Sequence, residues 1–251
     1  MRSYLLAFAV VALVTTPAIE AAAQDTEHIN RTIKLDPGGT LRLKNFSGRV
    51  SITATDRPEV VIDAVRRAPR GRLERIRLDI RTEGSNVVVI DANRHERSWF
   101  EFVGGNNIVE TDFDIQVPRR TDLDVAVFSS AVTIAEVEGS HKVHSFSGRL
   151  TLNDVTGPVR AHTFSGGVVI REKTGEDQNI EVDTFSGDVE LYVPDSARGS
   201  VSFNSFSGKL NSVMPLTFHS TSRRALRAEL GSGGTGRMRF KTFSGSVKID
   251  R

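Results

Sequence analysis

Histidine and aspartate recur at one place in a repeated segment of this chain, and both side chains bind metal ions. His144, His162 and Asp183 each lie two residues before a Phe-Ser-Gly triplet. If the repeats stack, His144 and His162 lie about 5 Å apart, close enough to share a metal ion. Asp183 continues the series, but no fixed third carboxylate or thiolate is evident. Surface histidines are the simpler interpretation, and we expect no metal and no cofactor.

Other patterns with catalytic or binding chemistry are weak. Asp122 and Asp124 alternate on one strand face and could help to hold Ca²⁺, but we favour the interpretation that they are solvated strand charges. Gly231–Gly236 matches G-x-G-x-x-G, but a strand-like segment follows it where a dinucleotide site needs a helix. Serine follows every repeated Phe without a base beside it in most copies, which favours turn serines over nucleophiles. We therefore expect no catalytic residue and no enzyme.

The elements that position these residues follow from the repeat itself. Phe-Ser-Gly, or Phe-Ser-Ser once, recurs 18 or 21 residues apart from residue 128 to residue 206, and the final spacing of 37 is about twice as long, as if one copy were lost. The repeated residues are Phe46, Phe128, Phe146, Phe164, Phe185, Phe206 and Phe243, with Gly48, Gly148, Gly166, Gly187, Gly208 and Gly245. A period near 20 residues is typical of a solenoid.

Apolar and polar residues alternate on both sides of each triplet, which predicts a strand, a corner and a second strand. Counted from Phe, the inward positions are odd before the triplet and even after it, so the chain must bend there. Glycine supplies the bend, and serine bonds nearby backbone groups. We predict an all-β fold: a single-stranded β-helix or solenoid with coils of about 18–21 residues. Longer, less regular coils precede them. A barrel or sandwich of hairpins is the alternative.

The repeated Phe side chains have two interpretations. Buried at a corner, each ring would stabilise the fold by about 1.5–3 kcal/mol. Exposed, the stacked rings would form a long apolar stripe of the kind that marks a partner surface. We expect burial.

The chain of 251 residues is expected to be an export signal followed by one domain. Residues 1–23 combine Arg2, an apolar run too short to span a bilayer and an Ala-rich end, which is typical of a signal peptide. Residues 24–251 form the solenoid: 24–127 as its irregular part and 128–251 as the regular repeats. The signal indicates the periplasm or surface of a Gram-negative bacterium. The absence of cysteine leaves packing and hydrogen bonds to stabilise the fold, and the net charge of +2 favours no nucleic-acid partner.

Three further segments carry predictions. Trp99, Phe100 and Phe102 lie in a long connection and could contact a partner or cover one end of the solenoid. The basic stretch 66–77 could meet anionic envelope polymers or phospholipid head groups, but we favour a solvated loop. Residues 211–237 interrupt the period as a short helix or an irregular strand pair. Charges at Lys248, Asp250 and Arg251 would keep the last strand from pairing edge to edge.

The repeated Thr/Ser-Phe-Ser-Gly-x-Val/Leu-x-Ile/Leu resembles a bacterial family of candidate adhesins with Thr-x-Ser-Gly-x-Val repeats. The glycine-rich Leu230–Gly234 also resembles that family's C-terminal end. The likeness covers roughly residues 40–251. It implies a β-helical fold and an envelope location, and it supplies no active site.

We therefore expect an exported, non-enzymatic, adhesin-like interaction or structural module of the bacterial envelope. It would bind an envelope protein or glycan and would carry no transmembrane anchor after signal cleavage. A carbohydrate-active β-helix enzyme and an accessory protein in envelope signalling are the alternatives. An enzyme would need acidic or basic residues converging in a groove, and the outward columns change type from coil to coil.

Overall fold

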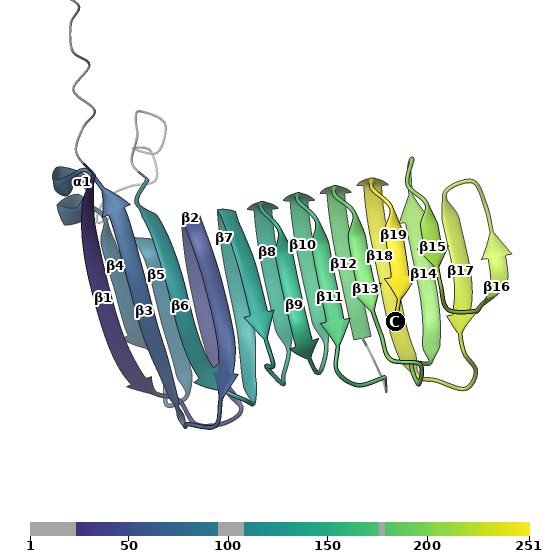
Figure 1. The fold of residues 1–251 in the computed structure, drawn as a ribbon, viewed down its shortest axis with the longest axis horizontal. Helices are drawn as coiled ribbons and strands as arrows, with labels where there is room; N and C mark the ends of the chain where they lie inside the picture. The colour runs from purple at the N-terminus through teal and green to yellow at the C-terminus, as the bar shows by residue number, and fades with distance from the viewer. Residues whose placement is uncertain (1–23, 95–107, 176–178) are drawn as a thin grey trace, which may run out of the picture.

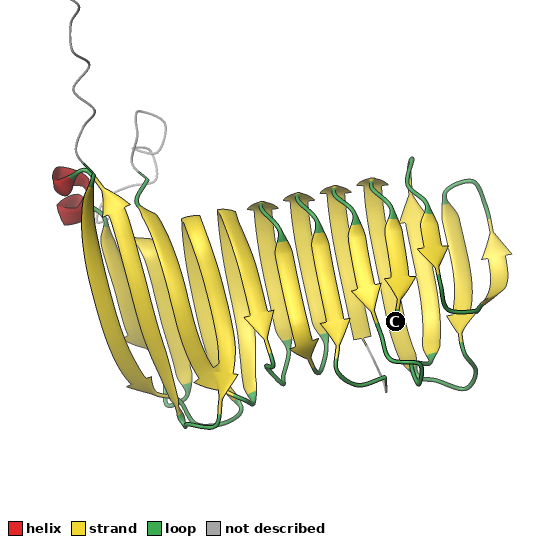
Figure 2. Ribbon diagram, viewed as in Figure 1, coloured by secondary structure: helices red, strands yellow, loops and turns green. Residues whose placement is uncertain are grey.

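The computed structural model describes residues 24–94, 108–175 and 179–251. These residues form 19 strands and one short helix, so the protein is all-β as predicted (Figure 1 and Figure 2). The strands join in one continuous sheet that folds back on itself into two layers, which gives a solenoid-like shape.

The elements before the regular coils are β1 (Asp25–Lys34), β2 (Gly39–Thr55), β3 (Glu59–Ala68), α1 (Arg70–Arg75), β4 (Arg77–Thr82), β5 (Val87–Arg94) and β6 (Glu110–Pro118). The later strands are β7 (Thr121–Ala135), β8 (His141–Ser147), β9 (Leu150–Val155), β10 (Val159–Ser165), β11 (Val168–Glu172), β12 (Asn179–Ser186), β13 (Val189–Tyr192), β14 (Gly199–Ser205), β15 (Leu210–Ser212), β16 (Leu216–Thr221), β17 (Ala225–Leu230), β18 (Gly236–Ser244) and β19 (Val247–Asp250).

Each regular coil places one strand in each layer, with the Phe-Ser-Gly corner between them. In the first layer β8, β10 and β12 pair in parallel, with His141 beside Val159 and Val159 beside Ile180. In the second layer β9, β11 and β13 pair in the same way. Residues 18 or 21 positions apart therefore lie side by side, as the spacing of the repeat predicted.

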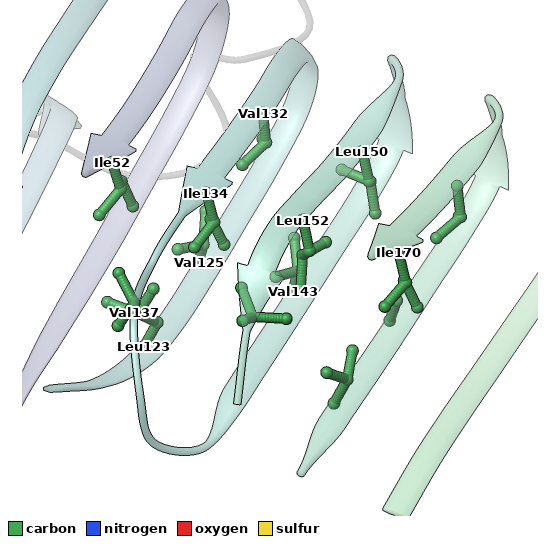
Figure 3. Close-up of a cluster of buried hydrophobic side chains, with 14 of the residues drawn as sticks. Ile52, Leu123, Val125, Val132, Ile134, Val137, Val143, Leu150, Leu152 and Ile170 are labelled. Carbon is green, nitrogen blue, oxygen red and sulfur yellow. The ribbon is translucent and has the colours of Figure 1, made fainter. Parts of the chain in front are cut away.

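The core lies between the two layers and consists of the inward residues of both strands. Val143 from the first layer and Leu150 and Leu152 from the second layer are fully buried (Figure 3). Each such side chain stabilises the fold by about 1.5–3 kcal/mol relative to exposure. Because like residues stack on like from coil to coil, the core forms one continuous cluster along the molecule.

The corner glycines are required by close packing between coils. A Cβ atom on Gly166 would lie 2.1 Å from the carbonyl oxygen of Gly148, and one on Gly187 would lie 2.1 Å from that of Gly166. Gly166 also has a φ of 143°, whereas Gly187 is outside the positive-φ region. The predicted need for positive φ therefore holds at some corners, such as Gly166. At both Gly166 and Gly187, however, the close approach of the neighbouring coil leaves no space for a Cβ atom.

The N-terminal part adds antiparallel strands to this arrangement. β2 and β7 each run through the corner and pair in parallel from Gly39 beside Thr121 to Thr53 beside Ala135. Ahead of them, β1–β3, β3–β6 and β4–β5 are antiparallel pairs. The basic stretch 66–77, expected as a loop, includes the helix α1.

The C-terminal coil does not lie at the end of the molecule. β18 pairs with both β12 and β14, and β19 pairs with both β13 and β15, so the last coil is inserted between two earlier ones (Figure 1). The expectation that the last strand is an edge is therefore wrong. β16 and β17 form an antiparallel pair, which confirms the strand-pair interpretation of this region. The spacing of 37 reflects this added pair and no lost copy.

Candidate functional site

The repeated phenylalanines form one ladder of stacked rings on the outside of the first layer. Centroids of neighbouring rings lie 4.6–4.9 Å apart, and the ring planes differ by 18° at most. The order along the ladder is Phe46, Phe128, Phe146, Phe164, Phe185, Phe243 and Phe206. Phe243 precedes Phe206 because the last coil is inserted.

The ladder is exposed, so the expected burial of the Phe side chains is wrong. Phe146 and Phe164 are 46% and 47% exposed. The reason is the alternation of the strand: in β8 the residues Val143 and Ser145 point inward, so Phe146 points outward. Stacking on neighbouring rings covers about half of each side chain.

A second outward column runs beside the ladder, two residues earlier on each strand. From coil to coil it consists of Asp91, Lys44, Ala126, His144, His162, Asp183, Lys241 and Asn204. The His144 and His162 rings stack with centroids 5.0 Å apart, as the repeat predicted. Nδ1 of His162 lies 3.3 Å from a carboxylate oxygen of Asp183.

A groove of about 960 Å³ lies along the ladder and this second column. Six of the seven ladder rings, from Phe46 to Phe243, line it. The residues between the two columns, such as Ser145 and Thr163, also line the groove, while their side chains are buried toward the core. The groove is therefore mostly apolar, with polar groups along one side.

At three corners the buried hydroxyl group immediately before Phe makes a hydrogen bond to the corner backbone; these residues are Thr184, Ser205 and Thr242. Oγ1 of Thr184 donates to the carbonyl of Gly187 at 3.1 Å, and Oγ1 of Thr242 is 2.9 Å from the carbonyl of Gly245. We predicted that the serine after Phe makes such bonds. At these three corners the bond is made by the residue before Phe, and among the described residues the serine after Phe makes one, from Ser207 to the carbonyl of Phe243.

The electrostatics of the groove vary along its length. Burial lowers the pKa of His144 below its usual 6.5, and the nearby His162 and Lys142 act in the same direction. His144 is therefore neutral at pH 7. In the part of the chain that the structure describes, neither Lys44 nor Lys241 has an ion-pair partner. Both ammonium groups border the groove.

The last ring of the ladder has a cationic neighbour. The guanidinium carbon of Arg224 lies 4.4 Å from the centroid of the Phe206 ring, a cation–π geometry. The ring of Phe243 covers the opposite face of Phe206. Both faces of this ring are therefore occupied, and only its edge is accessible.

The other predicted sites are not brought into this groove. Asp122 accepts a hydrogen bond from the backbone N–H of Ser140, and residues 231–235 form the connection between strands β17 and β18. Trp99, Phe100 and Phe102 lie outside the described residues. Among residues 24–94, 108–175 and 179–251, no group of three metal-ligating side chains comes together.

Lys44 and Lys241 lie two residues before Phe, in the column that the alternation predicts to face outward, whereas sequence reasoning missed Asp91 as a residue of this surface. The alternation places the two lysines there, because residues two positions before Phe point the same way as Phe. Lys44 and Asp91 meet only because β5 pairs in parallel with β2. The sequence of β5 contains no Phe-Ser-Gly triplet, so the repeat could not predict its pairing with β2.

Comparisons with known proteins bear on the fold. Residues 128–250 match the model of the family described as Toastrack DUF4097. No curated protein matches the chain. A solved structure of a candidate cell adhesion protein from Clostridium sporogenes has a TM-score of 0.53 and 10% identity, and the match covers 89% of this chain and 99% of that one. At this identity the likeness concerns the fold alone.

Two further solved structures are of candidate adhesins. The one from Bacteroides fragilis has a TM-score of 0.38 and 10% identity over 89% of this chain and 97% of that one. The one from Parabacteroides distasonis has a TM-score of 0.30 and 5% identity over 88% and 97%.

No described helix has the length and apolar composition needed to cross a membrane. The family model and the Clostridium sporogenes structure confirm the predicted resemblance to the candidate-adhesin family. The regular part of the chain, residues 128–250, is therefore similar to the Toastrack DUF4097 family.

Proposed function

We propose that the protein is an exported, non-enzymatic, adhesin-like interaction module of the bacterial envelope, wound as a single-stranded β-helix. It binds its ligand in the groove along the Phe ladder. The observation that carries this proposal is the row of half-exposed, stacked phenylalanine rings. The signal-like residues 1–23 support export to the periplasm or surface of a Gram-negative bacterium.

The exposure of the ladder supports a binding role. Contiguous apolar patches on a monomer are usually small, and larger ones mark binding surfaces. The ladder places six rings side by side along one groove. Each half-exposed ring leaves apolar surface in contact with water, an unfavourable arrangement that a bound ligand would relieve.

The groove favours binding over glycoside hydrolysis. Two catalytic carboxylates in a glycosidase are about 5–9.5 Å apart. The carboxylates that line the groove are Asp91 and Asp183. They are separated by five strand spacings, roughly 24 Å at about 4.8 Å per spacing. Neither can act on a bond that the other activates.

Cosedimentation with isolated Gram-negative envelope fragments tests the proposed function. The variant F146T/F164T removes two rings from the middle of the ladder and replaces them with a residue that suits strands. F218T is the matched control, because Phe218 is 58% exposed on β16, away from the ladder. Circular dichroism confirms that each variant is folded.

Wild type and F218T are expected to sediment with the envelope, and F146T/F164T to stay in solution. Equal sedimentation of all three, or of none, would overturn the proposed function. Release of reducing sugar from envelope glycans by wild type would overturn its non-enzymatic part.

A further inference from the structure

The geometry points to a single linear acyl chain as the occupant of the groove: we propose that it binds a free long-chain fatty acid with its carboxylate at Lys44. The tail lies along Phe128, Phe146 and Phe164. This inference rests on the proposed function, because it names the ligand class for the same groove.

The groove has the width of one extended chain. Its two walls are the ladder and the second column, which are two residues apart on the same strands. Two residues of a strand span roughly 6.6 Å. The six lining rings, from Phe46 to Phe243, extend over roughly 24 Å, or five strand spacings. A narrow, straight and mostly apolar groove fits an unbranched hydrocarbon chain.

The orientation of the rings disfavours a glycan. Sugars stack on the faces of aromatic rings, but each ring in the middle of the ladder has a neighbour on both faces. Phe164, for example, lies between Phe146 at 4.9 Å and Phe185 at 4.8 Å. Only ring edges face the groove, and these offer apolar contact to a hydrocarbon.

The strands beneath the groove disfavour an extended peptide. A peptide adds to a sheet through unpaired N–H and C=O groups at an edge. The strands under the middle of the groove already have partners on both sides: β10 pairs with β8 and β12, and β12 pairs with β10 and β18. The floor offers no edge there, so side-chain contacts must supply the affinity.

The order of residues along the second column selects the Lys44 end of the groove for the carboxylate. Beside Lys44, the next coil contributes Ala126, which is small and uncharged. Each lysine has one aspartate neighbour in the column, Asp91 beside Lys44 and Asp183 beside Lys241. Asp91 lies beyond Lys44, outside the path of the tail, whereas Asp183 lies toward the middle of the groove and would interrupt the apolar path of a tail that starts at Lys241. From Lys44 toward Asp183, the column contains only Ala126, His144 and His162. A carboxylate at Lys44 therefore leaves about four strand spacings, roughly 19 Å, for the tail.

Isothermal titration with saturated fatty acids, each below its aggregation concentration, tests the inference. Affinity is expected to rise about fourfold for every two methylene groups, half the effect of full burial because the groove is open on one side. The gain in affinity with added methylene groups should end once the tail extends past Phe185. An affinity independent of chain length, or no binding of hexadecanoate, would overturn the inference.

Three variants and one ligand analogue locate the site. A126W fills the groove next to Lys44 on an outward position and should abolish hexadecanoate binding without affecting folding, which circular dichroism checks. K44Q should weaken binding about two- to fivefold, as expected for an exposed charge pair, and K241Q is the matched control with affinity unchanged. Hexadecanol should bind K44Q and wild type equally. Unchanged binding by A126W, or a larger effect of K241Q than of K44Q, would refute the assigned position.

Two other occupants have distinct outcomes. Binding of phosphatidylglycerol vesicles without binding of hexadecanoate would assign the groove to a two-chain lipid surface. A dimer in analytical ultracentrifugation that A126W converts to a monomer would assign it to a second copy of the chain. Both results overturn the inference. If hexadecanoate fails to bind while envelope sedimentation still depends on the ladder, the inference fails and the proposed function stands.

Discussion

Replacing Glu172 by valine should stabilise the protein, by an amount that increases with pH. Glu172 ends β11 with its side chain in the core and is 7% exposed. Within the described residues, neither of its carboxylate oxygens has a hydrogen-bond partner. Buried valines occupy the equivalent place in neighbouring coils: Val137, Val155 and Val193. The substitution therefore gives this coil the residue that its neighbours have.

The size of the stability change follows from the pKa of Glu172. Burial raises the pKa of Glu172 from 4.5 to about 8. Between these values the native protein retains a proton that the unfolded chain has lost, so the free energy of unfolding falls as pH rises through this window. At about 1.4 kcal/mol per pH unit, the loss reaches about 5 kcal/mol by pH 9 and is absent below pH 4.5.

Urea unfolding at pH 5, 7 and 9 gives the free energy of unfolding of E172V and of wild type. The difference between the two removes the contributions of the other titrating groups, because both proteins contain them. The gain from E172V should be small at pH 5, about 3 kcal/mol at pH 7 and largest at pH 9. E172Q, which keeps the shape but cannot ionise, should show the same pH dependence relative to wild type. A difference that stays constant from pH 5 to pH 9 would refute the burial of an ionisable carboxyl at this place.

Three other substitutions test separate parts of the fold. G166A should lower the free energy of unfolding by at least about 2 kcal/mol, because its Cβ would contact the Gly148 carbonyl at 2.1 Å and the residue has positive φ; urea unfolding measures this. Burial lowers the pKa of His141, so wild type should lose stability relative to H141V as pH falls below 6.5, and equal pH dependence in thermal melts would contradict this. The Asn45 amide donates to the carbonyl of Thr111 at 2.9 Å, so N45A should cost about 1–3 kcal/mol in the same urea assay, whereas no change would show that water replaces the bond.

The sequence predicts the regular coils well because a stacked repeat depends on local rules. The spacing between Phe146 and Phe164 sets the length of a coil, and the alternation around each Phe sets which residues face the core. The stacked histidines followed from the same argument. The resemblance pointed to the family that residues 128–250 match.

The groove was missed because we gave the usual burial of phenylalanine more weight than the alternation of inward and outward residues along the strand. Phenylalanine is usually buried, so we expected the rings inside the fold. Yet the alternation that places Val143 inward also places Phe146 outward. Stacking of identical rings makes this exposure tolerable, because each neighbour covers part of the next ring.

Other features depend on pairings that no local pattern specifies. The antiparallel partners β1 and β3 lie at the N-terminal end, where no repeat defines a register. The inserted last coil is equally hidden, since Phe243 would stack on Phe185 or on Phe206 with the same local geometry. Both contacts are in fact made, at 4.9 Å each.

The place of β18 and β19 has a consequence for how the fold is completed. Until these last residues emerge during synthesis, β14 and β15 lack the parallel partners beside which they lie in the finished molecule. Ordered growth from one end to the other therefore cannot finish this protein. A nascent chain must either leave space for one strand in each layer between β12–β13 and β14–β15, or separate β14 and β15 from their temporary neighbours so that β18 and β19 can enter. A chain shortened by its last coil would lose an internal rung, and with it the link between everything before β14 and the hairpin beyond.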